Sequence, residues 1–255
     1  MERVTPVLLA VGTTHPLNIA GIGLDARIAA GLGVWVVTIV AGISAQSATR
    51  VLTRTPVDEA TIAAQFAALR DVPIAAIHVG ALLDARSVAA VARGLAEFDG
   101  VPVVCDPVVA ATGGDRLADH ATIEALRDCL FARCTLVTPN LDEASLLLGR
   151  PIADLEAMER AGRELRATGA AAVLIKGGHL ANAPADVLVT AAGATRFTAT
   201  RLPQTLRGTG DLLACAIAAR LAHGANLVES VDASRAFVRR SFAAGVAFAG
   251  TRTVP

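Results

Sequence analysis

The 255-residue sequence lacks tyrosine, has one tryptophan and contains only 3% aromatic residues. Acidic and basic residues are equal in number and mixed along the chain, so the formal net charge is zero. There is no basic stripe of the kind that binds nucleic acid. The composition therefore argues against nucleic acid as a partner.

Long apolar runs are also lacking, although 53% of the residues are hydrophobic. No run reaches the roughly 20 residues that a membrane helix needs. The first twelve residues lack the basic start and the small-residue cleavage site of a signal peptide. The four cysteines form no CxxC pair, which favours buried, reduced thiols. We therefore expect a cytoplasmic protein that does not contact a membrane.

Lysine is almost absent, because Lys176 is the single lysine and all the other basic residues are arginine. It lies in the segment VLIKGGHLAN, residues 173–182, at the end of an apolar run. One explanation is chance in a composition biased towards arginine. The other is a site that needs a compact ammonium, where a broad planar guanidinium would not fit.

Short apolar runs alternate with amphipathic segments along most of the chain. Such runs are typical of parallel strands buried on both faces. Their alternation with helices predicts βαβ units and helices on both sides of a sheet. The predicted strands are residues 5–12, 34–41, 74–80, 101–106, 135–138 and 171–176, and the predicted helices are residues 20–31, 58–70, 85–98, 119–132, 141–148 and 154–168.

The pattern changes in the last third of the chain. Residues 186–201 predict two strands around a glycine turn, an antiparallel hairpin at the sheet edge. From residue 211 to the end the chain is predicted to be helical. No linker, repeat or low-complexity stretch divides the sequence. We therefore predict one domain over residues 1–255.

Small, polar or acidic residues follow five of the predicted strands. Ligands of open α/β sheets bind beyond the carboxyl ends of the strands, so these loops predict a site at one edge. Any one loop is explained by the enrichment of turns in glycine, proline, asparagine and aspartate. The five together favour a site, and their sequences in chain order are GTTHPLN, GISAQS, DPVVAATGG, PNLDE and GGH.

The segment LRGTGDLLACAIAARLAHG, residues 206–224, predicts a helix opened by glycines. The backbone N–H groups of Gly208, Thr209 and Gly210 would form an anion-binding nest at its start. Asp211 has two interpretations: it stabilises the helix start, or it takes a proton from an alcohol during phosphoryl transfer. The chain has no GxxxxGK[ST] and no GxGxxG after the first strand, which excludes P-loop and Rossmann nucleotide sites.

Five segments together resemble one known family: AGIGLDARIAAGLG (20–33), ISAQS (43–47), VVCDPVVAATGGDRL (103–117), TPNLDEASLLLG (138–149) and KGGH (176–179). Over essentially its whole length the chain is similar to the ribokinase-like superfamily. Within it, the chain resembles the hydroxymethylpyrimidine/phosphomethylpyrimidine kinases of thiamine biosynthesis. The resemblance implies a three-layer α/β/α sandwich with a mainly parallel central sheet.

The activity that this resemblance implies is an ATP- and Mg²⁺-dependent phosphoryl transfer. The acceptor would be the hydroxymethyl group of 4-amino-5-hydroxymethyl-2-methylpyrimidine, and phosphorylation of its monophosphate stays open. The expected partners are this small aminopyrimidine alcohol and ATP, and family members commonly form homodimers.

The resemblance also implies residue roles on the phosphate side of the site. Lys176 would contact the triphosphate of ATP, which answers the question of the single lysine. Asn140 would contact phosphate or metal-bound water. Asp106 and Glu143 would hold Mg²⁺ directly or through water, because a hard cation prefers carboxylate oxygens. The alternative for both acids is an ordinary surface or helix-capping role.

On the acceptor side, Asp211 would be the general base, and the backbone amides of residues 208–210 would stabilise the transferred phosphoryl group. Gln46 and Asp25 would hydrogen-bond the aminopyrimidine ring, and Gly12 would lie against the substrate. The alternatives are an ordinary loop amide for Gln46 and a helix-face charge for Asp25.

The sequence departs from the family pattern at three places. The helix-start motif usually reads GTGC, with cysteine as the base, whereas Asp211 occupies that position here. Pyridoxal kinases carry GTGD, so a pyridoxal/pyridoxine-type kinase stays an alternative. Cys215, one turn further along the helix, is a poor substitute for the missing cysteine base. The first loop, GTTHPLNIAG, is one residue longer and lacks an aspartate and two glycines. His15 in this loop either replaces a lost polar contact or, as we expect, is exposed to solvent, and ATGG at 111–114 is expected to be neutral.

The altered first loop keeps one further alternative open. If the chemistry has been lost, the protein would be a non-catalytic pyrimidine-binding or regulatory protein. Tight ligand binding without formation of ADP would distinguish it from a kinase.

Overall fold

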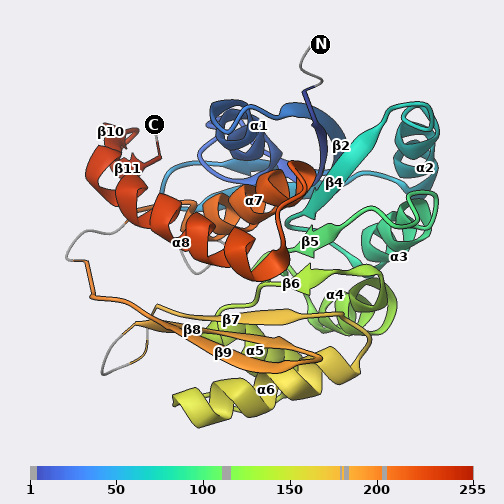
Figure 1. Ribbon diagram of the computed structural model, residues 1–255. Coiled ribbons are helices and arrows are strands. Elements are labelled where there is room, and N and C mark those ends of the chain that lie inside the picture. The colour runs from blue at the N-terminus through green and yellow to red at the C-terminus, as the bar shows by residue number, and fades with distance from the viewer. Residues whose placement is uncertain (1–4, 111–115, 179, 181–183, 203–205, 255) are drawn as a thin grey trace.

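A nine-stranded sheet forms the centre of the molecule, in a computed structural model that describes residues 5–110, 116–178, 180, 184–202 and 206–254 (Figure 1). The strand order is β3-β2-β1-β4-β5-β6-β7-β8-β9. Six adjacent strands are parallel, as their continuous hydrophobicity predicts: β2 (Trp35–Gln46), β1 (Val7–Thr14), β4 (Ile74–Val79), β5 (Val103–Cys105), β6 (Leu136–Val137) and β7 (Val173–Gly177).

The sheet edges are antiparallel. The predicted hairpin is present, as β8 (Ala185–Thr190) and β9 (Gly193–Thr198) beside β7. At the other edge β3 (Val51–Pro56) pairs with the end of β2, a strand that the sequence does not predict. Every residue of β3 is half-buried or exposed, so it carries no apolar run to mark it.

Helices cover both faces of the sheet, each over its own hydrophobic cluster (Figure 1). This three-layer arrangement confirms the predicted fold class. One face carries α1 (Gly21–Gly31), α7 (Thr209–Ala222) and α8 (Leu227–Ala244). The other carries α2 (Glu59–Ala67), α3 (Ala85–Leu95), α4 (His120–Ala125), α5 (Leu141–Leu148) and α6 (Leu155–Ala167), with a π turn (Leu126–Leu130) and a 3₁₀ turn (Phe131–Arg133) after α4.

The chain after residue 211 is not helical throughout, so that prediction is wrong in part. Gly224, with φ +82°, separates α7 from α8. After α8 the chain forms a separate antiparallel pair, β10 (Val246–Phe248) and β11 (Thr251–Thr253), joined through Gly250 at φ +78°. Gly224 ends the first helical run in the left-handed region, a conformation that other residues adopt at a cost, whereas Gly245 after α8 has φ −56°.

The helix starts divide into two groups. Six of the eight α-helices in the described ranges begin with an Asp or Asn side chain that accepts a backbone N–H, a cap worth about 1 kcal/mol. The other two, α1 and α7, begin at Ala20 and Gly208 without any side-chain cap. These two starts keep backbone donors for other acceptors. Among the described helices, none is both long and apolar enough to cross a membrane.

Candidate active site

The predicted phosphate-side residues meet at the carboxyl ends of the parallel strands. Lys176 lies near the end of β7, and its Nζ is 2.6 Å from Oδ1 of Asp106, which directly follows β5. The same ammonium lies 3.9 Å from Oε2 of Glu143 in α5. Thr138, after β6, donates its hydroxyl to Oδ1 of Asp106 at 2.9 Å. Three strand ends and one helix start thus converge on one ammonium.

Burial and charge work against each other in this cluster. Burial lowers the pKa of Lys176, but the charges of Asp106 and Glu143 outweigh it, so the pKa is raised and the ammonium stays protonated. Burial raises the pKa of Glu143 to about 7, although Lys176 opposes the shift. Both acids are buried, at 1% and 5% exposure.

Glu143 has a structural role as well as a place beside Lys176. Its Oε2 accepts the backbone N–H of Asn140 at 2.7 Å, and Oδ1 of Asn140 accepts the backbone N–H of Glu143 at 2.9 Å. This reciprocal capping box starts α5. Glu143 therefore does cap a helix, as the alternative interpretation predicted. The same carboxylate also lies beside the ammonium of Lys176.

The start of α7 packs directly onto this cluster. A Cβ on Gly210 would lie 2.9 Å from Oδ2 of Asp106 and 3.3 Å from Nζ of Lys176. Gly208 has φ +78°, and a Cβ there would lie 2.7 Å from the carbonyl oxygen of Ile19. The glycines on either side of Thr209 are required by this close approach. The uncapped helix start, with its free N–H groups and positive dipole, is suited to an anion.

Asp211 is the third residue of α7, and it does not cap its own helix. Its Oδ2 instead accepts the backbone N–H of Gly21, the first residue of α1, at 3.3 Å. Burial, followed by the charges of Asp25 and Asp106, raises the pKa of Asp211 to about 7. A carboxyl group of this pKa is matched to exchanging a proton near neutral pH.

A cavity with about 510 Å³ of empty space, part of it open to solvent, lies next to Asp211. Both uncapped helix starts border it, through Gly21 and Asp211. Small apolar side chains form part of the wall, and a few polar groups are placed between them, as in many small-molecule sites. Its polar lining consists of Thr13, His15, Ser44, Gln46, Arg207 and Asp211.

Comparison with known proteins identifies the family. The family model for phosphomethylpyrimidine kinase matches residues 17–254. The chain belongs to the phosphomethylpyrimidine kinase family. A hydroxymethylpyrimidine/phosphomethylpyrimidine kinase of Mycobacterium bovis is 37% identical over 238 residues, which cover 91% of this chain and 86% of that protein. The resemblance stated from the sequence motifs is thereby confirmed, and the protein is a phosphotransferase.

Two further relatives extend this result. The thiamine biosynthesis bifunctional protein of Geobacter sulfurreducens is 36% identical over 222 residues, covering 86% of this kinase and 45% of that protein. A Bacillus subtilis pyridoxal kinase, solved as an ADP complex, superposes with a TM-score of 0.89 and 26% identity. That superposition covers 98% of this chain and 97% of the other, in agreement with the ribokinase-like fold.

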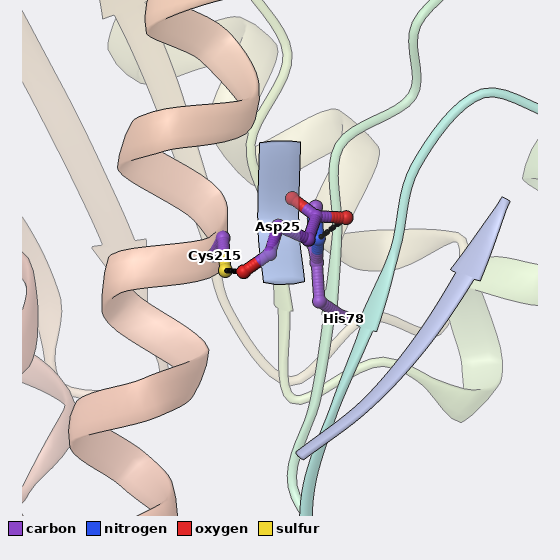
Figure 2. A group of neighbouring side chains, drawn as sticks. All are labelled: Asp25, His78 and Cys215. Atoms are coloured by element: carbon purple, nitrogen blue, oxygen red, sulfur yellow. Dashed lines mark hydrogen bonds and ion pairs between the residues drawn. The ribbon is translucent and has the colours of Figure 1, made fainter. Parts of the chain in front are cut away.

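Two of the residues expected to contact the substrate do not line the cavity of this kinase. Asp25 is 1% exposed and lies in α1, where its Oδ2 is 3.0 Å from Nδ1 of His78 in β4 (Figure 2). Gly12 is buried within β1, and Thr13 beside it lines the wall instead. Gln46 does line the cavity, at the end of β2.

His15 is buried, so the prediction that it is exposed to solvent is wrong. It is 5% exposed, and its Nε2 accepts the backbone N–H of Ala20 at 3.2 Å. This bond folds the first loop back over the start of α1. Burial lowers the pKa of His15, which favours the neutral ring. Its Nδ1 is buried without a hydrogen-bond partner among the described residues.

Sequence reasoning missed Arg207 and His78. Arg207 precedes the glycine motif, is 6% exposed, and donates from Nη1 to the carbonyl oxygen of Ala48. Its position next to residues 208–210 was the signal that could have identified it. His78 is the one polar residue in the apolar run IAAIHV, and that isolated position could have identified it as well. ATGG at 111–114 and His179 lie outside the described residues.

The donor set on the phosphate side suits a magnesium ion. Mg²⁺ is usually bound by one or two carboxylates together with substrate phosphates and water. Asp106 and Glu143 supply two carboxylates around the same point, where Lys176 now lies between them. These residues therefore fit the metal that the family resemblance implies.

Proposed function

We propose that this kinase transfers the γ-phosphoryl group of ATP to the hydroxymethyl group of 4-amino-5-hydroxymethyl-2-methylpyrimidine in thiamine biosynthesis. The observation that carries the proposal is the start of α7. There Asp211 lines the small-molecule cavity, and Gly210 packs on the pair Asp106–Lys176. An alcohol pocket and a phosphate cluster thus share one helix start. The names of the curated relatives support the pyrimidine as acceptor.

In the proposed step the substrate's hydroxyl oxygen bonds to the γ-phosphorus. The bond from that phosphorus to the oxygen bridging the β-phosphate breaks, and ADP leaves. Asp211 accepts the hydroxyl proton, which its pKa of about 7 allows at neutral pH. The backbone N–H groups of residues 208–210 donate to the oxygens of the transferred group, where negative charge spreads.

The charge on the triphosphate is offset by groups outside the alcohol pocket. Lys176 would turn part of its ion pairing from Asp106 to the phosphates. Asp106 and Glu143 would hold Mg²⁺, directly or through water, and the ion would neutralise charge at the β- and γ-phosphates. Asn140 would contact phosphate or metal-bound water through the amide nitrogen that its capping bond leaves free.

The acceptor ring would lie against the apolar part of the cavity wall, with Gln46 as its hydrogen-bonding amide. We further propose that the enzyme works in the cytoplasm as a homodimer. Phosphorylation of the monophosphate as a second step is compatible with the same pocket, because Arg207 supplies a cation on its wall.

A pyridoxal-type kinase is the second candidate, and two observations favour it. Asp211 stands where the resemblance to pyrimidine kinases leads us to expect a cysteine, and the fold superposes closely on a pyridoxal kinase. Phosphoryl transfer is common to both candidates, so they differ in the acceptor pocket alone.

The test is ADP release, measured by a coupled assay, against the pyrimidine alcohol, its monophosphate and pyridoxal. Reactions without acceptor are the control for ATP hydrolysis. We expect the highest kcat/KM on the pyrimidine alcohol. A higher value on pyridoxal would overturn this assignment in favour of the second candidate. Tight binding of the pyrimidine without ADP release would identify a binding protein.

A further inference from the structure

A buried cluster beneath the cavity joins three elements that the proposed reaction does not use directly. It consists of Asp25 in α1, His78 in β4 and Cys215 in α7 (Figure 2). All three are buried, and Asp25 and His78 are 1% and 0% exposed. A charged pair that is removed from water in this way is costly unless its surroundings compensate. Such a pair next to a site is a candidate for a functional role.

The cluster lies next to the proposed base. A Cβ placed on Gly80, just after β4, would lie 3.9 Å from both Oδ1 of Asp211 and Cε1 of His78. The imidazole and the carboxylate therefore face the same small space at the end of β4. Cys215, one turn after Asp211 on α7, donates its thiol to the backbone oxygen of Asp25 at 3.5 Å. This contact ties α1 to the helix that carries the base.

We propose that His78 is a positioning residue: Asp25 holds it in the protonated form, and its positive charge offsets part of the negative charge around Asp211, which favours the ionised carboxylate for proton transfer. This inference rests on the proposed function, because it assigns Asp211 as the base. Asp25 acts through His78 in this arrangement, which explains why it does not line the cavity. The resemblance placed Asp25 on the substrate, and its position beneath the cavity supports an indirect role instead.

The charges that face Asp211 decide whether its pKa rises or falls. Most of them are negative and raise its pKa, as burial does, whereas the charge of His78 lowers it. Burial lowers the pKa of His78 itself, but the negative charge of Asp25, together with those of Asp211 and Asp106, outweighs burial and the pKa is raised. The groups that face this region, from every element packed around it, are Asp25, His78, Asp106, Glu143, Lys176, Arg207 and Cys215.

A metal ion is the other occupant that this cluster would suit. The three ligand atoms all lie within 4.8 Å of one another. However, burial strongly raises the pKa of Cys215, and the thiol uses its proton to bond the backbone of Asp25. A metal ligand would have to be a thiolate. The geometry therefore favours a proton on His78 over a metal ion.

The first test is the pH profile of kcat/KM for the acceptor at saturating Mg²⁺ and ATP. In His78→Gln the positive charge is lost, and we expect the acid limb to move up by about one pH unit. In His78→Lys a permanent cation remains, and the limb should return to the wild-type position or below it. His223→Gln, an exposed histidine at the end of α7, is the matched control and should leave the profile unchanged. An unmoved limb in His78→Gln, or equal movement in Gln and Lys variants, overturns the proposal.

A double variant guards against loss of folding. Combining Asp25→Asn with His78→Gln removes both partners of the buried pair, so neither is left as an unpaired charge. The double variant loses the charge of Asp25, which raises the pKa of Asp211, and the charge of His78, which lowers it. We expect its acid limb at or slightly below the wild-type position. An acid limb as high as that of His78→Gln would show that the charge of His78 is not what sets the profile.

The second test does not depend on turnover. The chain has five histidines, so ¹⁵N-histidine NMR resolves the His78 ring, which His78→Gln assigns. We expect His78 to be doubly protonated at neutral pH and to lose that proton in Asp25→Asn. A neutral ring in the wild type overturns the proposal even if no acceptor is found. Equimolar zinc that survives chelator dialysis, measured by elemental analysis, would overturn it in favour of a metal site.

Discussion

The two halves of the site differ in how far their polar groups are already satisfied. On the phosphate side, Asp106, Glu143 and Lys176 are joined to one another and to the capping box of α5. On the acceptor side, Nδ1 of His15 and Nε of Arg207 are buried without hydrogen-bond partners among the described residues. The charged groups of the phosphate side are thus already paired with one another, whereas the acceptor side holds buried polar atoms without partners among the described residues.

This difference indicates where substrate specificity resides. A self-paired phosphate cluster can serve any acceptor that reaches it, because ATP is the same in every case. A site whose buried polar groups need partners rejects a substrate that cannot supply them. Two of the three departures from the family pattern fall on the acceptor side, in the first loop and at Asp211, and the third lies outside the described residues. The choice between pyrimidine and pyridoxal should therefore be decided there.

The largest expected effect comes from the residue that joins both halves. Asp211→Asn keeps an oxygen that can accept the N–H of Gly21, so the thermal unfolding midpoint should barely change. The amide cannot take up the hydroxyl proton, and kcat should fall by about 10²–10⁴-fold. Steady-state turnover and thermal unfolding check this together.

Asp211→Cys sharpens the same test. A thiol can act as base only as the thiolate, so this variant should exceed Asp211→Asn in rate, with its acid limb displaced to higher pH. If wild type, Asn and Cys variants turned over alike at equal stability, Asp211 would not be the base.

An intermediate effect is expected on the phosphate side. The pKa of Glu143 is about 7 because the group is buried, so protonation should compete with Mg²⁺ as the pH falls through 7. Glu143→Gln preserves a capping box and removes the charge. We expect about 10-fold to 100-fold weaker Mg²⁺ activation, and loss of its pH dependence.

The measurement is Mg²⁺ titration of turnover at several pH values. Wild type should need more Mg²⁺ at acid pH, whereas the Gln variant should need the same high concentration throughout. Asp142→Asn, in the same helix turn, is the control for a general loss of charge. An unchanged Mg²⁺ requirement in Glu143→Gln would remove Glu143 from the metal site.

The smallest effect should be confined to the acceptor side. His15→Ala removes a ring that lines the cavity and folds the first loop back onto Ala20, and we expect KM for the acceptor to rise about 5-fold, equivalent to roughly 1 kcal/mol. KM for ATP should stay the same, because the phosphate cluster does not touch this loop. A proportionate change in both constants would show that the loop merely supports the fold.

The sequence predicted the phosphate side better than the acceptor side for a physical reason. Asp106, Asn140, Glu143 and Lys176 each occur in a short motif at a strand end, and parallel strands bring their ends to one edge. The glycine motif before Asp211 was visible in the same way. The single-domain assignment over residues 1–255 stays a prediction.

The acceptor side depends on contacts between residues far apart in the chain. The burial of His15 comes from its bond back to Ala20 and from the elements that close over the loop. The pair Asp25–His78 joins α1 to β4, and neither local sequence reveals the other. A single polar residue in an apolar strand indicates a buried partner but does not say which one.

The single lysine has a practical consequence for chemical labelling. An amine-selective acylating reagent can attach to a side chain of this protein at one position only, Lys176. That amine is held as an ammonium by Asp106 and Glu143 and is largely shielded, so its acylation is slow in the resting protein. Any event that loosens this ion pair changes the labelling rate. Acylation of the proteolytic peptide that contains Lys176, measured separately from the N-terminal amine, therefore reports the state of the ion pair without an engineered probe.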